Sequence, residues 1–444
     1  MIVLQPWSRH IARFARAIRV CFAAARSCSR AGNTSPALVV AEADTIWASL
    51  FPPQVCDRAV VPVVIDRRSS GFLMFHLMFS LPWLIVATRF IAPLPWPWMV
   101  KLALAALLLF ASQYHLFSRF TSGSVFAPEF PRPLVIAFNL FFGGIVLLAA
   151  MQVLLDIISI LIFAVTWSFP AVPPGIRYGM GVVAVGLASF GIAQAIRVPP
   201  LKQIEVTIPG LSPDLDGYRV VQLTDLHISR LFTGDWARRV VEKTNALDAD
   251  LIVITGDLID GSVDIRREDI APLADLKARD GVLTVPGNHE YFFEVDRWLG
   301  HLPSLNMRIL ANEHAVIERG EGKLVIAGVT DLSARFTGAV EPDLGKALSG
   351  APADAPVILL DHQPRLAERA ASHGVALQLS GHTHGGMVRG LDQIVARANN
   401  GFVSGFYQVG QMQLYVNNGT GLWPGFALRI GVPAELTEFT LRRM

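Results

Sequence analysis

The chain has 444 residues, of which 52% are hydrophobic and 17% charged, and its formal net charge is +2. Soluble globular proteins usually have about a quarter of their residues charged, so the composition argues against a wholly soluble protein. A net charge this small gives no electrostatic reason to expect nucleic acid as a partner.

Residues 1–70 form a first segment, and its first thirty residues contain six arginines and no acidic residue. A basic stretch of this kind can lie on an anionic membrane surface or act as a targeting segment, but we favour a poorly ordered tail. It lacks the compact apolar core and the small-residue cleavage site of a signal peptide. Cys21, Cys28 and Cys56 lie here without the spacing of a zinc site or a disulfide framework.

Residues 71–197 are predicted to be a membrane region with about four transmembrane helices. A spanning helix needs about 20 mostly apolar residues, because the bilayer offers no water to an irregular backbone. Four runs meet this requirement, at about 71–91, 99–117, 134–167 and 178–196. The third is longer than one span needs, so it is either a tilted helix or a helix broken near Asp156.

The distribution of cations predicts the side of the membrane on which the rest of the chain lies. With four spans, both ends of the region share one side, where we count Arg58, Arg67, Arg68, Arg119, Arg132, Arg197 and Lys202 against Arg89, Lys101 and Arg177 opposite. Because cytoplasmic loops collect Arg and Lys, we expect a multi-pass protein of the inner membrane with a cytoplasmic C-terminal domain. A missed or split third helix would invert this prediction.

From residue 198 to 444 the pattern becomes that of an ordinary α/β domain, in which short β-rich runs alternate with helical stretches and polar turns. The expected strands are 219–223, 251–255, 282–285, 323–328, 357–360, 376–379, 412–416 and 438–441. The expected helices are 236–246, 270–277 and 364–372.

Five short segments of this domain concentrate residues that bind metals, and each follows an apolar, strand-like run. They read Thr-Asp-Leu-His at 224–227, Thr-Gly-Asp-Leu-Ile-Asp at 255–260, Pro-Gly-Asn-His-Glu at 286–290, Leu-Leu-Asp-His at 359–362 and Ser-Gly-His-Thr-His-Gly-Gly at 380–386. Because α/β sheets place their sites at strand ends, we expect these five loops to meet at one sheet edge.

The residue types in these loops suit coordination of divalent cations. Asp225 and His227 are two residues apart, so on an extended strand they would face one point. His382 and His384 repeat that spacing. Asp257 can bridge two cations because its carboxylate has two oxygens.

Two further side chains extend this site. Asn288 offers a neutral amide oxygen, and Asp260 is placed to hydrogen-bond a ligand from outside. A single histidine is more often a surface or core residue than a ligand, but five of the eleven histidines fall in these segments, which makes coincidence a poor explanation. His301, His314 and His373 lie in polar stretches without such neighbours, and we expect no role for them.

The five segments resemble, in order, the motifs of the calcineurin-like metallophosphoesterase family: D-x-H, G-D-x-x-D, G-N-H-[DE], an isolated H and G-H-x-H. The resemblance covers about residues 200–444, and the apolar spans together with Asn-Gly-Thr-Gly-Leu-Trp-Pro at 418–424 are similar to its bacterial membrane-anchored branch. It implies a four-layer αββα sandwich after the transmembrane bundle. It also implies one metal held by Asp225, His227, Asp257 and His384, a second held by Asp257, Asn288, His362 and His382, and His289 as the catalytic histidine.

Two cations about 3.5–4 Å apart can bridge a hydroxide, lower its pKa and clamp a phosphoryl group during in-line attack. We therefore expect a phosphoesterase that hydrolyses a phosphodiester, pyrophosphate or phosphomonoester. His289 would protonate the leaving oxygen or stabilise phosphoryl charge, and Glu290 would either orient that imidazole or face solvent. Manganese is the first expectation for the metal, and iron, zinc or cobalt would suit the same ligands. Arg230 would either contact a substrate phosphate or be an ordinary surface residue.

Membrane attachment is the clue to the substrate. A site held at a bilayer meets lipids more often than soluble nucleotides, so the sharpest expectation is a lipid-linked phosphodiester or pyrophosphate. Some members of the family that the chain resembles cleave UDP-diacylglucosamine, and others act on cyclic or generic phosphodiesters. The alternatives are an inactive membrane scaffold or metal-binding sensor, and a transporter with an attached hydrolase. We expect neither nucleic acid nor a protein as partner.

Overall fold

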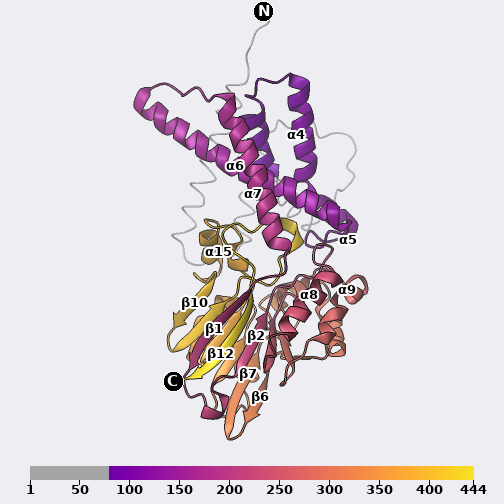
Figure 1. Ribbon diagram of the computed structural model, residues 1–444, viewed down its shortest axis with the longest axis vertical. Helices are drawn as coiled ribbons and strands as arrows, with labels where there is room; N and C mark the ends of the chain where they lie inside the picture. The colour runs from indigo at the N-terminus through magenta and orange to yellow at the C-terminus, as the bar shows by residue number, and fades with distance from the viewer. Residues whose placement is uncertain (1–79) are drawn as a thin grey trace, which may run out of the picture. The chain divides into compact units, whose positions relative to one another are not determined.

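A computed structural model describes residues 80–444, and all of these belong to one compact unit (Figure 1). The predicted N-terminal segment 1–70 lies outside the described residues, as do residues 71–79 of the first predicted span.

Apolar helices make up the first part of the described chain. They are Ser80–Ile91, whose last part is the π-helix η2 (Val86–Ile91), then α4 (Trp98–Ser112), α5 (Tyr114–Ser122), α6 (Arg132–Thr166) and α7 (Pro174–Ile196). Pro133 and Pro174 lie in the first turns of α6 and α7. Proline is well placed there, because the first N–H groups of a helix have no intrahelical partner.

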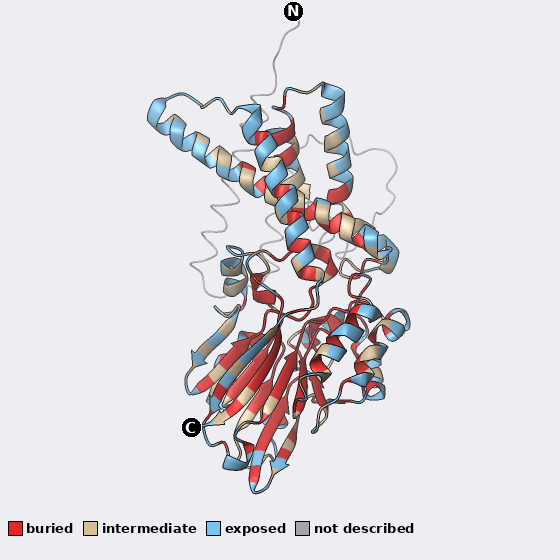
Figure 2. Cartoon of the chain, in the orientation of Figure 1, coloured by how far each residue is buried: buried red, intermediate tan, exposed pale blue. Residues whose placement is uncertain are grey.

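The third and fourth predicted spans are confirmed as continuous helices. With 35 and 23 residues, α6 and α7 are long and apolar enough to cross a bilayer, and much of their surface is exposed (Figure 2). Asp156 does not break α6. The second predicted span, 99–117, is bent rather than continuous, because α4 and α5 meet at 44° around Gln113. The described residues thus contain two helices of spanning length, or three spans if the bent pair counts as one.

The strands of the described chain form two six-stranded sheets. The first has the order β1 (Leu201–Ile208), β12 (Leu436–Arg443), β2 (Arg219–Leu223), β3 (Leu251–Thr255), β4 (Val282–Val285) and β5 (Met307–Ile309). The second has the order β10 (Gly405–Val409), β11 (Met412–Val416), β9 (Leu377–Ser380), β8 (Val357–Leu360), β7 (Gly322–Gly328) and β6 (Glu313–Arg319). Strands β2 to β5 are parallel, as are β7, β8, β9 and β11. Parallel strands bring the loops that follow them to one edge of each sheet.

The helices of this domain are α8 (Gly234–Asn245), α9 (Val263–Ile270), α10 (Asn288–Phe292), α11 (Val295–His301), α12 (Ala334–Thr337), α13 (Leu344–Ala347), α14 (Ala367–Ser372) and α15 (Asp392–Ala398). Of these, α8 and α9 pack against the outer face of the first sheet, and α13 and α14 against that of the second. Short 3₁₀ turns lie at Pro213–Leu215, Ala271–Asp275, Leu302–Leu305, Pro364–Leu366, His384–Gly386 and Pro424–Phe426.

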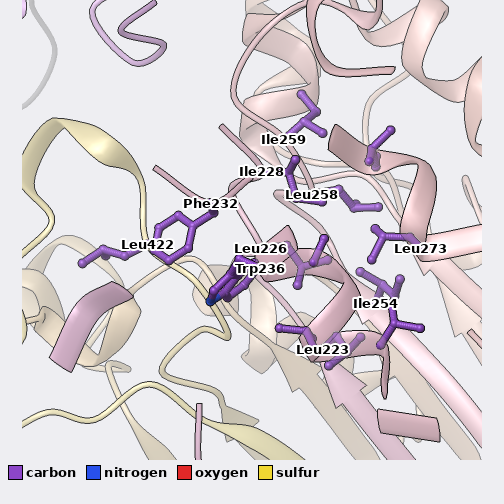
Figure 3. Packing of buried hydrophobic residues seen from close by; sticks show 14 of the residues in the cluster. Leu223, Leu226, Ile228, Phe232, Trp236, Ile254, Leu258, Ile259, Leu273 and Leu422 are labelled. Atoms are coloured by element: carbon purple, nitrogen blue, oxygen red, sulfur yellow. The ribbon is translucent and has the colours of Figure 1, made fainter. Parts of the chain in front are cut away.

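Three apolar clusters hold these layers together, because successive side chains of a strand point to opposite faces. Leu251 and Val253 of β3 lie between the two sheets. Ile254 faces outward into a cluster with Trp236 of α8, where Leu422 also packs (Figure 3). On the outer face of the second sheet, residues of β8 pack against α13 and α14. The layered α/β fold expected for this domain is confirmed.

The predicted elements of this domain match the structure closely. All eight predicted strands are present, five of them with the predicted bounds. The helix predicted over 270–277 is wrong: α9 ends at Ile270, and Ala271–Asp275 is a 3₁₀ turn. Pro272 explains the change, because its ring would clash with the carbonyl four residues earlier in an α-helix. Strands β1, β5, β6 and β10 were not predicted.

Candidate metal centre

The five predicted loops meet in one place. Three follow β2, β3 and β4 in the first sheet, and two follow β8 and β9 in the second. Backbone hydrogen bonds join them across long sequence distances. Asp225 N donates to the Gly256 carbonyl at 3.0 Å, and Gly381 N donates to the His362 carbonyl at 3.0 Å.

The backbone of these loops is in an uncommon conformation. The φ angles of Asp225, His227, Asp257, His382 and His384 lie between 46° and 71°, in the left-handed region that residues other than glycine rarely adopt. The prediction that an extended strand aims the first pair is therefore wrong, because β2 ends at Leu223. The side chains converge because each loop turns back sharply, and strained backbone of this kind concentrates at functional sites.

Two glycines allow the loops to approach this closely. A Cβ atom on Gly287 would lie 2.2 Å from Asp257 Oδ1. A Cβ atom on Gly381 would lie 2.3 Å from Asp225 Oδ2. Side chains at these two positions would displace carboxylates of the centre, which explains the glycine in both motifs.

Asp225, His227 and His384 place one ligand atom each around a common point, with Asp257 beside His227, and all four side chains are buried. His227 Nε2 lies 3.2 Å from His384 Nε2, 3.9 Å from Asp225 Oδ1 and 3.8 Å from Asp257 Oδ2. His384 Nε2 lies 3.6 Å from Asp225 Oδ1. These separations are those of ligand atoms that each bind the same cation at about 2 Å.

Asp257 also belongs to a second group, with Asn288, His362 and His382. Its Oδ2 lies 3.2 Å from His362 Nε2. Asn288 Oδ1 lies 3.1 Å from His362 Nε2 and 2.7 Å from His382 Nδ1. Carboxylate and imidazole atoms in these groups could hold metal ions, and the amide oxygen of Asn288 adjoins them. The structure therefore brings all seven predicted ligands together.

Asp260 orients two imidazoles of the centre. Its Oδ1 hydrogen-bonds both His227 Nδ1, at 3.3 Å, and His289 Nδ1. A proton held on each Nδ1 leaves each Nε2 facing the centre, which is how outer carboxylates prepare histidine for a metal. His362 is oriented in the same way by the Thr255 carbonyl, 2.8 Å from its Nδ1.

His289 lies beside both groups of ligands. Its backbone N–H donates to Asp257 Oδ1 at 2.8 Å, and its Nε2 is 3.9 Å from Asp257 Oδ2. Burial disfavours the imidazolium, but the carboxylates of Asp257 and Asp260 outweigh burial and raise the pKa of His289 to about 9. A protonated imidazole at this position suits a general acid.

Glu290 has neither of the two roles expected for it. Its buried carboxylate accepts hydrogen bonds from the backbone N–H groups of Asp257 at 3.1 Å, Leu258 at 2.8 Å and Gly287 at 2.6 Å. Burial and the charge of Asp257 raise the pKa of Glu290 to about 7. Glu290 thus ties the second loop to the third, and Asp260 is the residue that orients His289.

Two arginines make contacts that the sequence did not predict. Arg230 Nε donates to Glu129 Oε2 at 2.7 Å, so its guanidinium is already paired. Arg429, which was not predicted, is fully buried and donates to the carbonyls of Asn418 at 2.7 Å and Gly421 at 2.8 Å. It also donates to the His384 carbonyl at 3.3 Å. A lone arginine in the apolar run Phe-Ala-Leu-Arg-Ile at 426–430 was the available signal.

Comparison with known proteins agrees with this geometry. The family model described as calcineurin-like phosphoesterase matches residues 218–386. A zebrafish (Danio rerio) transmembrane protein with a metallophosphoesterase domain is 35% identical over 271 residues, which are 59% of this chain and 62% of that protein. This chain thus spans less than two thirds of the zebrafish protein.

Bacterial relatives are matched over more of their length. A metallophosphoesterase of Helicobacter pylori is 33% identical over 268 residues, covering 60% of this chain and 70% of the relative. A metallophosphoesterase of Campylobacter jejuni is 34% identical over 263 residues, covering 59% of this chain and 68% of the relative. Sequence, loop geometry and relatives agree, and the chain belongs to the calcineurin-like metallophosphoesterases, a family of metal-dependent phosphoester hydrolases.

Proposed function

We propose that this protein is a membrane-anchored phosphoesterase with two metal ions, which hydrolyses phosphodiester, pyrophosphate or phosphomonoester bonds. One observation carries the proposal: Asp257 Oδ2 lies 3.8 Å from His227 Nε2 and 3.2 Å from His362 Nε2. One oxygen therefore adjoins a nitrogen of each ligand group, which suits a carboxylate that bridges two cations.

The roles of the side chains follow from their placement. Asp225, His227, Asp257 and His384 would hold one metal, and Asp257, Asn288, His362 and His382 the other. When bound, two divalent cations supply the Lewis acidity that activates water and offsets phosphoryl charge. His289 would protonate the leaving oxygen from Nε2, because Asp260 holds the proton on Nδ1. We propose manganese first, since the donor set has oxygen and nitrogen but no sulfur, with iron, zinc or cobalt as alternatives.

Membrane attachment supports a lipid-linked substrate. Asn139 of α6 donates to the Pro424 carbonyl at 2.9 Å and accepts from Ala427 N at 2.7 Å. Tyr114 OH donates to the same Pro424 carbonyl at 2.9 Å. The apolar helices are thus hydrogen-bonded to the segment that follows the loop held by Arg429, and a site built this way meets lipids first.

The hairpin of α6 and α7 supports a cytoplasmic metal domain in the inner membrane. Packed against each other, α6 and α7 bring the chain back to the side it left. Arg119, Arg132, Arg197 and Lys202 lie near that side, whereas Arg89, Lys101 and Arg177 lie at the far end. The excess of arginine predicts that the domain side is cytoplasmic.

The test is a hydrolysis screen of the detergent-purified full chain. Bis-p-nitrophenyl phosphate, p-nitrophenyl phosphate and a UDP-diacylglucosamine-type lipid would each be incubated with manganese, iron, zinc or cobalt. We expect turnover that needs added metal and stops with EDTA. Metal binding without turnover of any substrate would favour the metal-binding sensor or scaffold instead.

A further inference from the structure

The loop between α5 and α6, residues 123–131, reaches the metal centre from the apolar helices. The Phe126 ring lies 5.4 Å from the His289 ring, at 63° to it. Phe126 also stacks on Phe292 of α10, at 5.1 Å and 15°, and meets Trp423 edge-on at 5.7 Å. We call Phe126, Phe292 and Trp423 the aromatic wall.

Glu129 ties this loop to the metal domain. Its carboxylate pairs with Arg230 at 2.7 Å and with Arg266. The Arg266 side chain is fully buried, and its Nε donates to the Asp260 carbonyl at 2.8 Å. A buried guanidinium needs a partner charge, and this one contacts both the loop and the residue that orients His289. At the end of the loop, Arg132 Nε donates to the Leu231 carbonyl at 3.0 Å.

The aromatic wall continues into the apolar helices. The Trp423 ring lies 6.2 Å from the His115 ring, which meets Phe142 of α6 edge-on at 5.1 Å. The wall itself stays partly open, since Phe292 is 46% exposed and Phe126 and Trp423 are half-buried. Half-exposed aromatic rings beside a polar centre are typical of ligand sites with an apolar part.

We propose that the aromatic wall binds an acyl chain of a membrane lipid whose phosphoester bond is cleaved at the metal centre. This inference rests on the proposed hydrolase function and names its substrate class. The phosphoryl group then lies at the ligand groups and the chain lies along Phe126 toward α6. The loop 123–131 becomes the element that selects amphiphilic substrates, and the apolar helices become part of the active site.

The experiment compares two substrates with the same reacting bond. Both are p-nitrophenyl phosphodiesters of a diacylglycerol, one with long acyl chains and one with butyryl chains, presented in mixed micelles to the manganese-loaded full chain. The measured quantity is the ratio of kcat/KM for the long-chain ester to that for the short-chain ester. We expect Phe126→Ala to lower this ratio about tenfold or more, and Phe126→Leu to restore part of it.

Two further variants make the result decisive. Phe292→Ala, at a position that is 46% exposed, should lower the same ratio, which keeps the test valid if Phe126→Ala fails to fold. Phe120→Ala removes a 77% exposed phenylalanine of α5 and should leave the ratio unchanged.

The possible outcomes distinguish failure of this inference from failure of the proposed hydrolase function. Equal losses on both esters would overturn the inference and make Phe126 only a support for His289. Equal kcat/KM for the two esters in the unaltered protein would overturn it as well. Failure to hydrolyse either ester or bis-p-nitrophenyl phosphate would contradict the proposed hydrolase function itself.

Discussion

Asp257, Asp260 and His289 contact one another, but their positions give them different consequences when changed. Asp257 faces both groups of ligands through one oxygen. Asp260 touches the centre only through the Nδ1 atoms of His227 and His289. His289 lies outside the two predicted groups of four, but it forms a cluster with His227 and Asp257 that could also hold a metal. Substitution of the first and the last should separate metal binding from proton transfer.

Asp257→Asn should remove both metals and nearly all turnover. An amide keeps the shape of the side chain but loses its negative charge, and a neutral amide oxygen is too weak a donor to bridge two cations. Metal content and kcat would be measured on the same purified sample. Two bound metals together with an unaltered rate would rule out the bridging role.

His289→Ala should keep both metals and lower kcat by ~10²–10⁴, the usual effect of losing a positioned general acid. The matched control is His373→Ala, since His373 is exposed and was expected to have no role. Metal analysis and steady-state kinetics check both variants. A His289→Ala sample that lacks metal would instead make this histidine a ligand.

At the scale of secondary-structure elements, the helices and the metal domain meet along the segment after β11. Leu428 packs against α7 so closely that a Cβ on Gly191 would lie 2.5 Å from its Cδ1. Arg429 N donates to the Gly191 carbonyl at 3.1 Å, while the Arg429 side chain bonds the His384 carbonyl. One short segment therefore contacts both the apolar helices and the loops of the metal centre.

Asn139→Leu should destabilise this contact by about 1–3 kcal/mol, because Ala427 N would be left buried without its acceptor. Asn245→Ala is the matched control: Asn245 makes two similar backbone bonds at an exposed position, where water can replace them. Thermal unfolding of both variants in detergent would be compared with the unaltered protein. Equal shifts in Tm would show that the helices are not coupled to the domain through Asn139.

For the whole molecule, the centre concentrates buried carboxylates and imidazoles whose charges depend on one another. Asp257, Asp260 and five histidines lie within this small volume. In the metal-free protein, burial opposes the imidazolium of His362, but the charge of Asp257 raises its pKa well above the usual value. His289 behaves in the same way, with a pKa of about 9. Stability without metal should therefore depend on pH.

The metal-free protein should lose stability as the pH rises from about 6.5 to 9. A histidine with a raised pKa stabilises the fold fully below its unfolded value of 6.5, and that contribution disappears as the pH passes its folded value. Tm would be measured in EDTA across this pH range, and His289→Ala should reduce the dependence of Tm on pH. Added manganese should raise Tm at every pH, by an amount that grows with its concentration. A flat curve in EDTA for the unaltered protein would contradict this prediction.

Local patterns in the sequence were sufficient to predict the central strands, α6 and α7, whereas the roles of the site residues came from motifs shared with a known family and stay a prediction. A buried parallel strand is a short apolar run whatever surrounds it, and a spanning helix is a long one. The edge strands β1 and β6 were missed because their alternating polar residues also suit loops, and only their partners β12 and β7 make them strands.

Only the tertiary structure decided how the ligands converge and what surrounds them. The left-handed backbone at Asp225 and His384 depends on contacts between loops more than 150 residues apart. The ion pair of Glu129 with Arg266 and the ring contact of Phe126 with His289 also join residues that are far apart in the chain. Sequence periodicity depends only on residues that are close together in the chain. The roles described here arise from residues that meet only when the chain folds.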